Sequence, residues 1–263
     1  MAIEYRFSGS QYDQLPKLAA DLVGRKVAVI AAFGTSSVLA AKEATATIPI
    51  VGSFGTDPVD IGAVSSLNRP TGNITGAYSL LQAVTANRFQ LLHEIAPSAG
   101  SIGLLANPAG PITEAEKREA GKAAQILGVQ LVILDASTPA EIEAAFAKLA
   151  EQRIGALVIG GDGLFLNQRD QLVALAARHS IPAIYAFAEA VQAGGLMSYE
   201  GNRAELGRVA GTYVGRILKG DKPADLPLQQ STRIEMALNR KTAKALGLTV
   251  PPAILVFADT VIE

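Results

Sequence analysis

Short apolar runs alternate with longer amphipathic stretches along almost the whole chain. The runs are rich in Val, Ile and Leu, which is typical of buried strands, whereas apolar residues three and four positions apart are typical of helices. The pattern predicts strands at Ile3–Phe7, Val27–Phe33, Ile50–Phe54, Ile102–Ala106, Gln130–Leu134, Ala156–Gly160, Ala183–Tyr185, Leu196–Tyr199 and Leu228–Leu238. It predicts helices at Tyr12–Val23, Ser37–Ala44, Thr85–Ile95, Glu114–Leu127, Pro139–Gln152, Leu166–His179, Ala204–Leu218 and Arg240–Leu246.

This alternation predicts an α/β fold built from parallel sheets that carry helices on both faces. Local signals mark several helix ends. Thr113–Glu116 and Thr138–Glu141 both fit the capping-box pattern, in which the first side chain accepts from a backbone N–H three residues on. Gly128 and Gly247 stand where a left-handed residue is expected to end a helix.

Two turn-rich stretches divide the chain into domains. Ile95–Ser101 separates two strand–helix series, and Gly220–Pro227 forms a second break, so both indicate crossings between domains. The first series contains three predicted strands and the second contains five. The first domain is therefore expected to be short of strands.

Composition narrows the classes of function. The 263 residues are 49% hydrophobic and 18% charged, and 23 basic against 24 acidic side chains give a formal net charge of −1. A disordered chain is excluded, and the near-zero charge argues against nucleic acid or a membrane surface as partner. Cysteine is absent, and the two histidines, His93 and His179, stand at helix ends where a structural role is expected. We expect no metal and no cofactor, because no nucleotide-binding, nucleophile-elbow or zinc-protease motif occurs.

Candidate ligand-binding residues follow the predicted strands. In open parallel sheets, ligands bind at the carboxyl ends of strands, beside helix N-termini. Small and polar residues come after four of these strands, and two tyrosines end others. The candidates are Gly34, Thr35, Ser36, Phe54, Thr56, Asp57, Asn107, Asp162, Phe165, Tyr185 and Tyr199.

Each candidate also has an ordinary structural interpretation. Gly34–Ser36 would donate backbone N–H groups to a carboxylate or phosphate, or would simply begin a helix. Asp57 would accept from a ligand amine, or would cap the segment that follows it. Asp162 and Phe165 would supply a charge and an aromatic wall, or would belong to a glycine-rich turn. The tyrosines would face a ligand, or would pack in the core with a wet hydroxyl.

A family resemblance extends over essentially the whole chain. The stretches that carry it are Arg69–Gly76, Arg169–His179, Gly194–Tyr199, Tyr213–Gly220 with Pro223–Pro227, and Lys241–Leu248. In these stretches the chain resembles the extracytoplasmic substrate-binding proteins of ABC transporters, in the branch that includes tryptophan- and tyrosine-binding receptors. The ordered set is specific to that family, although no single stretch is diagnostic of a substrate.

The resemblance implies a fold like that of type I periplasmic binding proteins. Two three-layer αβα domains would be joined by a hinge and would hold a small ligand in the cleft between them. The first domain would comprise residues 1–98 with 200–225, and the second residues 99–199 with 226–263. The candidate residues fall where members of the family line this cleft.

The function implied is capture without chemistry, so no enzyme activity is expected. The ligand would favour the closed state of a hinged protein, which would then dock on the permease of an ABC transporter. An amino acid or an aromatic carboxylate fits best, because a helix N-terminus holds an anionic group and an aromatic wall holds the body of the ligand.

The chain departs from the family at its start. Its first predicted strand corresponds to the family's second, so we expect an incomplete first sheet with an exposed edge, which favours a homodimer. The resemblance implies a periplasmic or membrane-associated extracytoplasmic location. Met1–Phe7 shows no signal-peptide pattern, so the chain as given is expected in the cytoplasm.

Two further classes of function stay open at this point. The first is a cytoplasmic regulatory domain of the same architecture that binds an effector; the missing leader favours it, and the missing DNA-binding head opposes it. The second is a small-molecule transferase in which Asp57 and Asp162 act as acid and base in one pocket.

Overall fold

The computed structural model describes residues 2–9, 11–70 and 72–263, and its backbone contacts divide the chain into two compact units. Unit 1 comprises Met1–Leu80 with Gly201–Arg233, and unit 2 comprises Leu81–Glu200 with Ile234–Glu263. Each unit holds its own sheet of mainly parallel strands with helices packed against it, which confirms the α/β fold class expected from the alternation of strands and helices.

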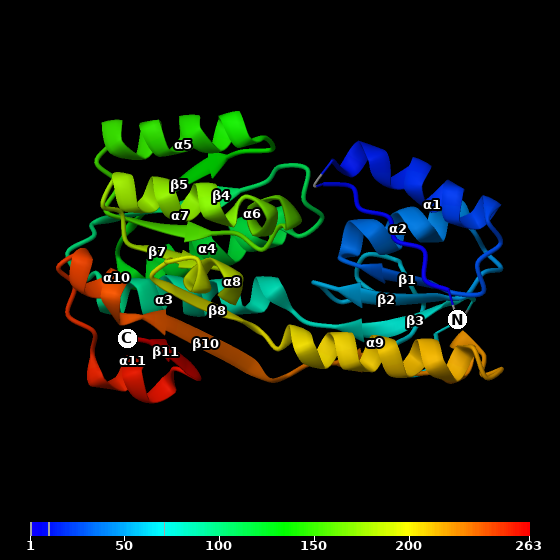
Figure 1. Cartoon of the computed structure of the whole chain (residues 1–263). Helices are drawn as coiled ribbons and strands as arrows, with labels where there is room; N and C mark the ends of the chain where they lie inside the picture. Colours follow the sequence, from blue (N-terminus) through cyan, green and yellow to red (C-terminus); the bar gives the residue numbers. More distant parts are fainter. Residues whose placement is uncertain (1, 10, 71) are drawn as a thin grey trace. The chain divides into compact units, whose positions relative to one another are not determined.

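Unit 1 contains a four-stranded sheet in the order β1-β2-β3-β9, with every pair of neighbours parallel. Helices α1 and α2 cover one face of this sheet and α9 covers the other (Figure 1). Its elements are η1 (Tyr12–Gln14), α1 (Leu15–Gly24), β1 (Ile30–Phe33), α2 (Thr35–Ala44), β2 (Ile50–Phe54), β3 (Ile74–Tyr78), α9 (Arg203–Ile217), η3 (Pro223–Asp225) and β9 (Gln229–Gln230).

Unit 2 contains a seven-stranded sheet in the order β11-β10-β8-β7-β6-β4-β5. Its first elements are η2 (Leu81–Val84), α3 (Thr85–Ile95), β4 (Ser101–Ala106), α4 (Thr113–Leu127), β5 (Gln130–Asp135), α5 (Pro139–Glu151), β6 (Ala156–Ile159) and α6 (Gly163–Asn167). Then come α7 (Arg169–Arg178), β7 (Ala183–Tyr185), α8 (Ala188–Gln192), β8 (Met197–Gly201), β10 (Ile234–Asn239), α10 (Arg240–Ala245), α11 (Pro252–Phe257) and β11 (Thr260–Ile262).

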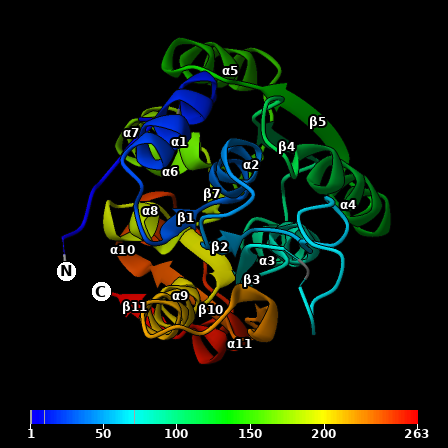
Figure 2. The same cartoon turned by 90° about the vertical axis from the view of Figure 1, so that its right-hand side faces the viewer.

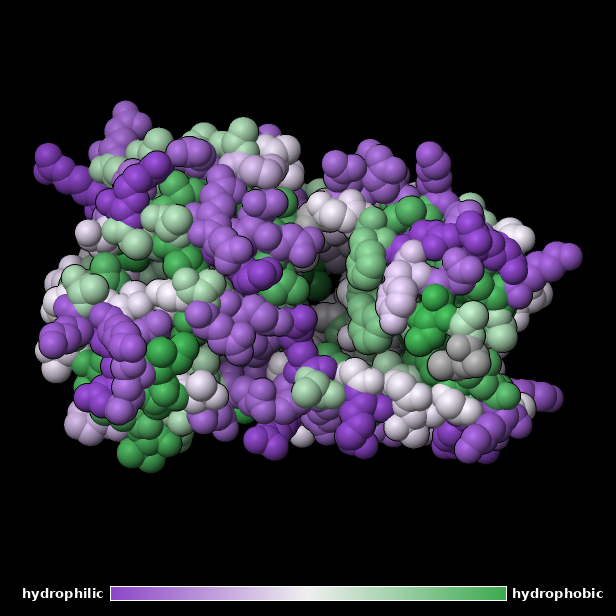
Figure 3. Space-filling model, in the orientation of Figure 1, coloured by the Kyte–Doolittle hydropathy of each residue, from purple (hydrophilic) through white to green (hydrophobic). Residues whose placement is uncertain are grey.

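The two faces of the unit 2 sheet pack against different helices. Alternate strand residues such as Leu104 and Val158 pack with α3 and α4, while Leu105 and Leu157 pack with α5 and α7. Figure 2 shows α5 and α7 on one side of these strands and α3 on the other. Polar side chains cover much of the outer surface, but Figure 3 shows a green patch over α11, where Val256 and Phe257 are largely exposed.

The boundaries between the units differ from the expected ones at two crossings. The first lies after Leu80 rather than near residue 98, because α3 packs on α4 and the turn before β4 therefore lies inside unit 2. The last lies after Arg233 rather than near residue 225, because β9 pairs with β3. The middle crossing, after Glu200, falls within one residue of the expected position.

Four sequence-based assignments of elements are corrected. Ile3–Phe7 is not a strand, since its backbone pairs with no described strand. Ile74–Tyr78 is an unexpected central strand of unit 1, as the paired glycine Gly76 conceals the strand pattern. The segment predicted as one strand at Leu228–Leu238 forms β9 and β10, in different sheets, and that predicted as one helix at Leu166–His179 forms α6 and α7.

Three of the four helix-end signals are confirmed. The Thr138 hydroxyl accepts from the Glu141 N–H at 3.2 Å, and Gly128 and Gly247 adopt left-handed φ angles of 68° and 69°. The Thr113 prediction is wrong, because Thr113 is already the first residue of α4 and its hydroxyl donates to the Asn107 carbonyl. Thr113 thus holds the turn after β4 instead of capping the helix.

The closest backbone approach in unit 1 lies between two paired glycines. Gly76 on β3 faces Gly52 on β2, and a Cβ at Gly76 would lie 1.9 Å from the Gly52 carbonyl oxygen. The φ angle of Gly76 is 143°, which side chains rarely adopt. The register of β2 against β3 therefore requires glycine at this position.

Replacing Gly76 with alanine is expected to prevent stable folding of unit 1, because the new methyl group meets backbone that cannot move aside. Gly121→Ala in α4 is the matched control, since a Cβ there meets no atom within 4 Å and alanine favours a helix by up to about 1 kcal/mol. Urea unfolding followed by circular dichroism measures both. Equal stability of the two variants would contradict the close approach of β2 and β3.

Candidate ligand-binding site

Parallel pairing gathers the residues that follow successive strands at one edge of each sheet. In unit 1, strands β1, β2 and β3 run in register, so the turns after Phe33, Phe54 and Tyr78 share this edge. In unit 2, strands β4 to β8 do the same. We call these the carboxyl edges of units 1 and 2, and most of the sequence-predicted site residues lie on them.

At the carboxyl edge of unit 1, α2 begins directly after β1. Gly34 is the N-cap with a φ angle of 92°, so no side chain caps the first turn of this helix. The buried Thr35 hydroxyl accepts from the Gly55 N–H at 3.0 Å, which fastens the turn after β2 to the start of α2. Ser36 is half-buried in the same first turn, and Thr56 is buried in the turn after β2. A helix N-terminus therefore stands at this edge and is tied to the neighbouring turn by the Thr35 hydroxyl.

Asp57 caps the segment that follows it, which was the ordinary structural alternative to binding a ligand. Its Oδ1 accepts from the Val59 N–H at 2.8 Å. Burial raises the pKa of the Tyr78 hydroxyl, and the charge of Asp57 raises it further, so the carboxylate and the phenol are neighbours. The Tyr78 hydroxyl also donates to Gln230 at 3.3 Å.

At the carboxyl edge of unit 2, Asn107 and Asp162 bind one another. The Asn107 amide donates to Asp162 Oδ1 at 3.0 Å, and that oxygen also accepts from the Leu164 N–H at 2.8 Å, capping α6. Asn107 Oδ1 in turn accepts from the Ser137 hydroxyl at 3.0 Å. Both side chains are buried, so the turns after β4, β5 and β6 are locked together.

A buried ion pair lies next to the carboxyl edge of unit 2 and holds two of its segments. Arg88 on α3 and Glu116 on α4 meet at 3.3 Å, with side chains 0% and 3% exposed. Glu116 accepts from the Gly161 N–H, and Arg88 donates to the Tyr199 carbonyl at 3.0 Å. One pair of charges therefore holds both the turn after β6 and strand β8.

Burial is the dominant influence on the pKa values of this pair. It raises the pKa of Glu116 above the ordinary value of 4.5, while the Arg88 charge and the Gly161 N–H oppose the rise. Burial lowers the pKa of Arg88, and the carboxylates of Glu116 and Glu200 oppose this fall. The Arg88 guanidinium thus has two carboxyl groups near it, those of Glu116 and Glu200, and a third, Asp162, lies near Glu116. With more acidic than basic groups, this edge favours a cationic group over an anionic one.

Three of the predicted aromatic site residues are core residues. Phe54 is 1% exposed and packs in unit 1 between its two helices and its sheet, and Phe165 and Tyr185 are each 2% exposed in the core under α5 and α7. Tyr199 is half-buried, and its hydroxyl accepts from Asn87 at 3.3 Å. None of the first three therefore offers an open aromatic wall on its own unit.

Sequence reasoning missed Arg88, Glu116 and Tyr78. A single arginine or glutamate on a predicted helix gives no sign in the sequence that its side chain is buried. Tyr78 was missed because its strand, Ile74–Tyr78, was not predicted. Phe33, 61% exposed at the end of β1 and directly before Gly34, was also passed over as a strand residue.

Neither a metal centre nor a membrane-crossing helix occurs in the part of the chain that the structure describes. No group of three or more His, Asp and Glu side chains is placed there to hold a metal ion. No described helix is both long and apolar enough to cross a bilayer.

Solved structures of other proteins share this architecture. The crystal structure of a conserved domain protein from Vibrio cholerae is 26% identical, covers 99% of this chain and 87% of its own, and has a TM-score of 0.89. An ABC domain from Streptococcus pneumonia in complex with L-Trp is 22% identical, covers 96% of this chain and 86% of its own, and has a TM-score of 0.86. These likenesses confirm a fold of the type I periplasmic-binding-protein class.

The sequence itself identifies the family. The profile of the ABC transporter substrate binding proteins matches residues 1–262, and the chain belongs to this family. The tyrosine-binding protein of Clostridioides difficile is 28% identical over 248 residues, which are 94% of this chain and 71% of that protein. The family is defined by binding a solute rather than by a reaction.

Removing the cation of the buried pair is expected to destabilise unit 2 strongly. Arg88→Met leaves Glu116 buried without a counter-ion, which costs about 3–5 kcal/mol in the free energy of unfolding. Arg178→Ala is the control, since its pair with Glu143 is more than half exposed, and a change within about 0.5 kcal/mol is expected. Urea denaturation measures both, and equal losses would contradict the role of the buried pair.

The loss in Arg88→Met is also expected to depend on pH. Without Arg88 the pKa of Glu116 rises further, so the folded variant holds its proton at a pH where the unfolded chain has released it. A carboxyl whose folded pKa is raised costs stability increasingly as pH rises above its unfolded pKa. The loss should therefore be smaller at pH 5 than at pH 7, and a loss independent of pH would show that Glu116 does not carry it.

Proposed function

We propose that the chain is the solute-binding component of an ABC transporter and captures an amino acid with an aromatic side chain. Family membership supports the class of function, and the tyrosine-binding relative and the L-Trp complex support the class of ligand. Each unit would contribute its carboxyl edge to binding the ligand, and the loaded protein would dock on the transporter's permease outside the cytoplasm.

The observation that carries the choice of ligand is the difference between the two edges. The uncapped first turn of α2 offers backbone N–H groups and the positive end of a helix dipole, which suit a carboxylate. The edge of unit 2, where the three carboxyl groups of Glu116, Glu200 and Asp162 outnumber the one guanidinium of Arg88, suits an ammonium group. An α-amino acid presents both charges on one carbon, whereas a simple aromatic acid presents only the anion.

The proposed contact at α2 is tested by placing a negative charge there. Ser36→Glu suits the dipole of α2 and should leave folding intact, yet it competes with an incoming carboxylate. Isothermal titration with L-tyrosine should show at least about a tenfold loss of affinity, since like charges at close range repel by roughly 1–4 kcal/mol. Ser36→Gln is the matched control of similar size, and it should bind within about threefold of the parent chain.

Ligand analogues separate the two edges. Tyramine lacks the carboxylate and 3-(4-hydroxyphenyl)propionate lacks the amine, so each should bind at least about tenfold more weakly than L-tyrosine. Ser36→Glu should weaken the acid but not the amine. The proposal fails if L-tyrosine, L-tryptophan and L-phenylalanine all give no heat, or if Ser36→Glu binds them as the parent does.

We also propose that the chain forms a homodimer. Strand β1 is the outer strand of the described unit 1 sheet, and Phe33 on it is 61% exposed, so this edge suits pairing with a second copy. Sedimentation over a range of concentrations should show association that Phe33→Lys reduces. A monomer at all concentrations would remove the proposal.

A further inference from the structure

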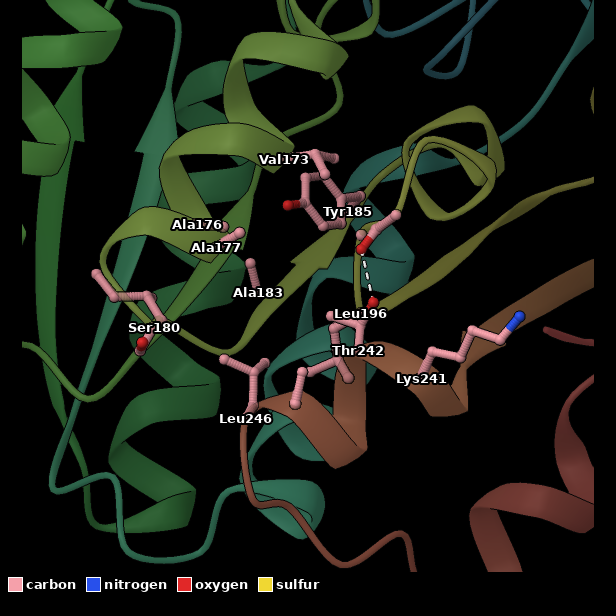
Figure 4. Close-up of a pocket in the computed structure, with 14 residues that line it drawn as sticks. Val173, Ala176, Ala177, Ser180, Ala183, Tyr185, Leu196, Lys241, Thr242 and Leu246 are labelled. Atoms are coloured by element: carbon pink, nitrogen blue, oxygen red, sulfur yellow. Dashed lines mark hydrogen bonds between the residues drawn. The ribbon is translucent and has the colours of Figure 1, made fainter. Parts of the chain in front are cut away.

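A pocket that is partly open to solvent lies within unit 2. Its volume is about 310 Å³, and it is lined by α7, α10, the segments that lead into β7 and β8, and Tyr185 at the end of β7 (Figure 4). Ile181 precedes β7, and Gly194, Gly195 and Leu196 precede β8. The five residues of β8, at about 3.3 Å each, separate these segments from the carboxyl edge by roughly 16 Å.

The cavity has apolar walls. Alanine, valine, isoleucine and leucine side chains form most of its surface, and its size is at the lower end of the range of about 300–1,000 Å³ typical of small-molecule sites. Lys241 extends away from Tyr185, with its ammonium directed outward, and the exposed Ser180 lies at the margin (Figure 4). The interior therefore offers no charge to a ligand.

The Tyr185 hydroxyl supplies the polar group. Tyr185 is 2% exposed, and in Figure 4 its ring lies beside Val173 with the hydroxyl turned toward α7. The hydroxyl is not among the fully buried polar atoms of the described residues, so a guest in the pocket can reach it. Burial raises the pKa of the group, so at neutral pH it is an intact O–H that can donate to a guest.

The backbone around the cavity is fixed, which keeps the space open. The Thr242 hydroxyl donates to the Gly194 carbonyl at 2.7 Å, joining α10 to the segment before β8. A Cβ on Gly195 would lie 2.6 Å from the Tyr185 ring, so glycine there leaves room for the ring in its observed position. These contacts hold the backbone on two sides of the pocket.

We propose that this cavity is a second binding site, which takes a small neutral molecule with a ring or branched apolar body and one hydroxyl or carbonyl group that bonds to Tyr185. A dry apolar cavity of about 150 Å³ holds benzene, so this space accommodates roughly eight to twelve non-hydrogen atoms. The site differs from the proposed amino-acid site in place and in chemistry, since it has neither an anion-binding helix end nor an acidic cluster.

The test uses p-cresol, with toluene as the matched probe that lacks the hydroxyl, and follows binding to the full chain by NMR. Wild-type protein should bind p-cresol with millimolar or tighter affinity, and toluene about three- to tenfold more weakly, as one hydrogen bond predicts. Tyr185→Phe should lower the affinity for p-cresol by at least about threefold and leave that for toluene within twofold. Saturating L-tyrosine should leave the p-cresol signal in place.

Two alanines on the same helix provide a matched pair of variants. Ala177 lines the cavity and Ala174 does not, while both are exposed and tolerant of a larger side chain. Ala177→Leu should weaken both probes at least about fivefold, and Ala174→Leu should weaken neither. The proposal is overturned if p-cresol fails to bind, or if it binds equally well to Ala177→Leu and Tyr185→Phe. It is also overturned if L-tyrosine displaces p-cresol fully while Ala177→Leu has no effect.

Discussion

Parallel pairing is the constraint on which the rest of this protein depends. Because strands β1 to β3 run parallel to one another, as do strands β4 to β8, the turns after them collect at one edge of each unit. In unit 1 the pairing of β3 with β2 leaves no room for a side chain at Gly76. The same pairing determines where helix N-termini and polar side chains can bind a solute. It therefore also determines which residues are candidates for ligand binding.

At the carboxyl edges, some groups stabilise the turns and others stay available to bind a ligand. Asn107 and Asp162 satisfy one another and the backbone, and Arg88 with Glu116 fixes the turn and the strand above them. These groups shape the edge and set its charge while being largely committed to internal bonds. The first turn of α2 is different, because its backbone donors have no capping side chain. In the proposed function, unit 1 would therefore bind the carboxylate of the ligand and unit 2 its amine.

Sequence periodicity predicted the fold class, most helices and the edge on which the polar candidates lie. It failed where a residue's neighbours decide its role. Gly76 falls outside every predicted element, yet it is a central strand residue whose partner strand allows no side chain. Ile3–Phe7 alternates like a strand but pairs with no described strand. Phe54 could have been assigned to the core, because it shares its strand face with the buried Ile50. The Asn107–Asp162 bond joins residues 55 positions apart, which a single sequence does not reveal.

The most direct test of the account is a titration of labelled protein with L-tyrosine, followed by the backbone amide signals of both units. The account predicts saturable shifts at the amides of residues 34–36, at the start of α2, and at those of residues 161–164, after β6, with the same dissociation constant at both places. Shifts confined to one unit, or centred on residues 180–181 and 194–196, which precede β7 and β8, would contradict it.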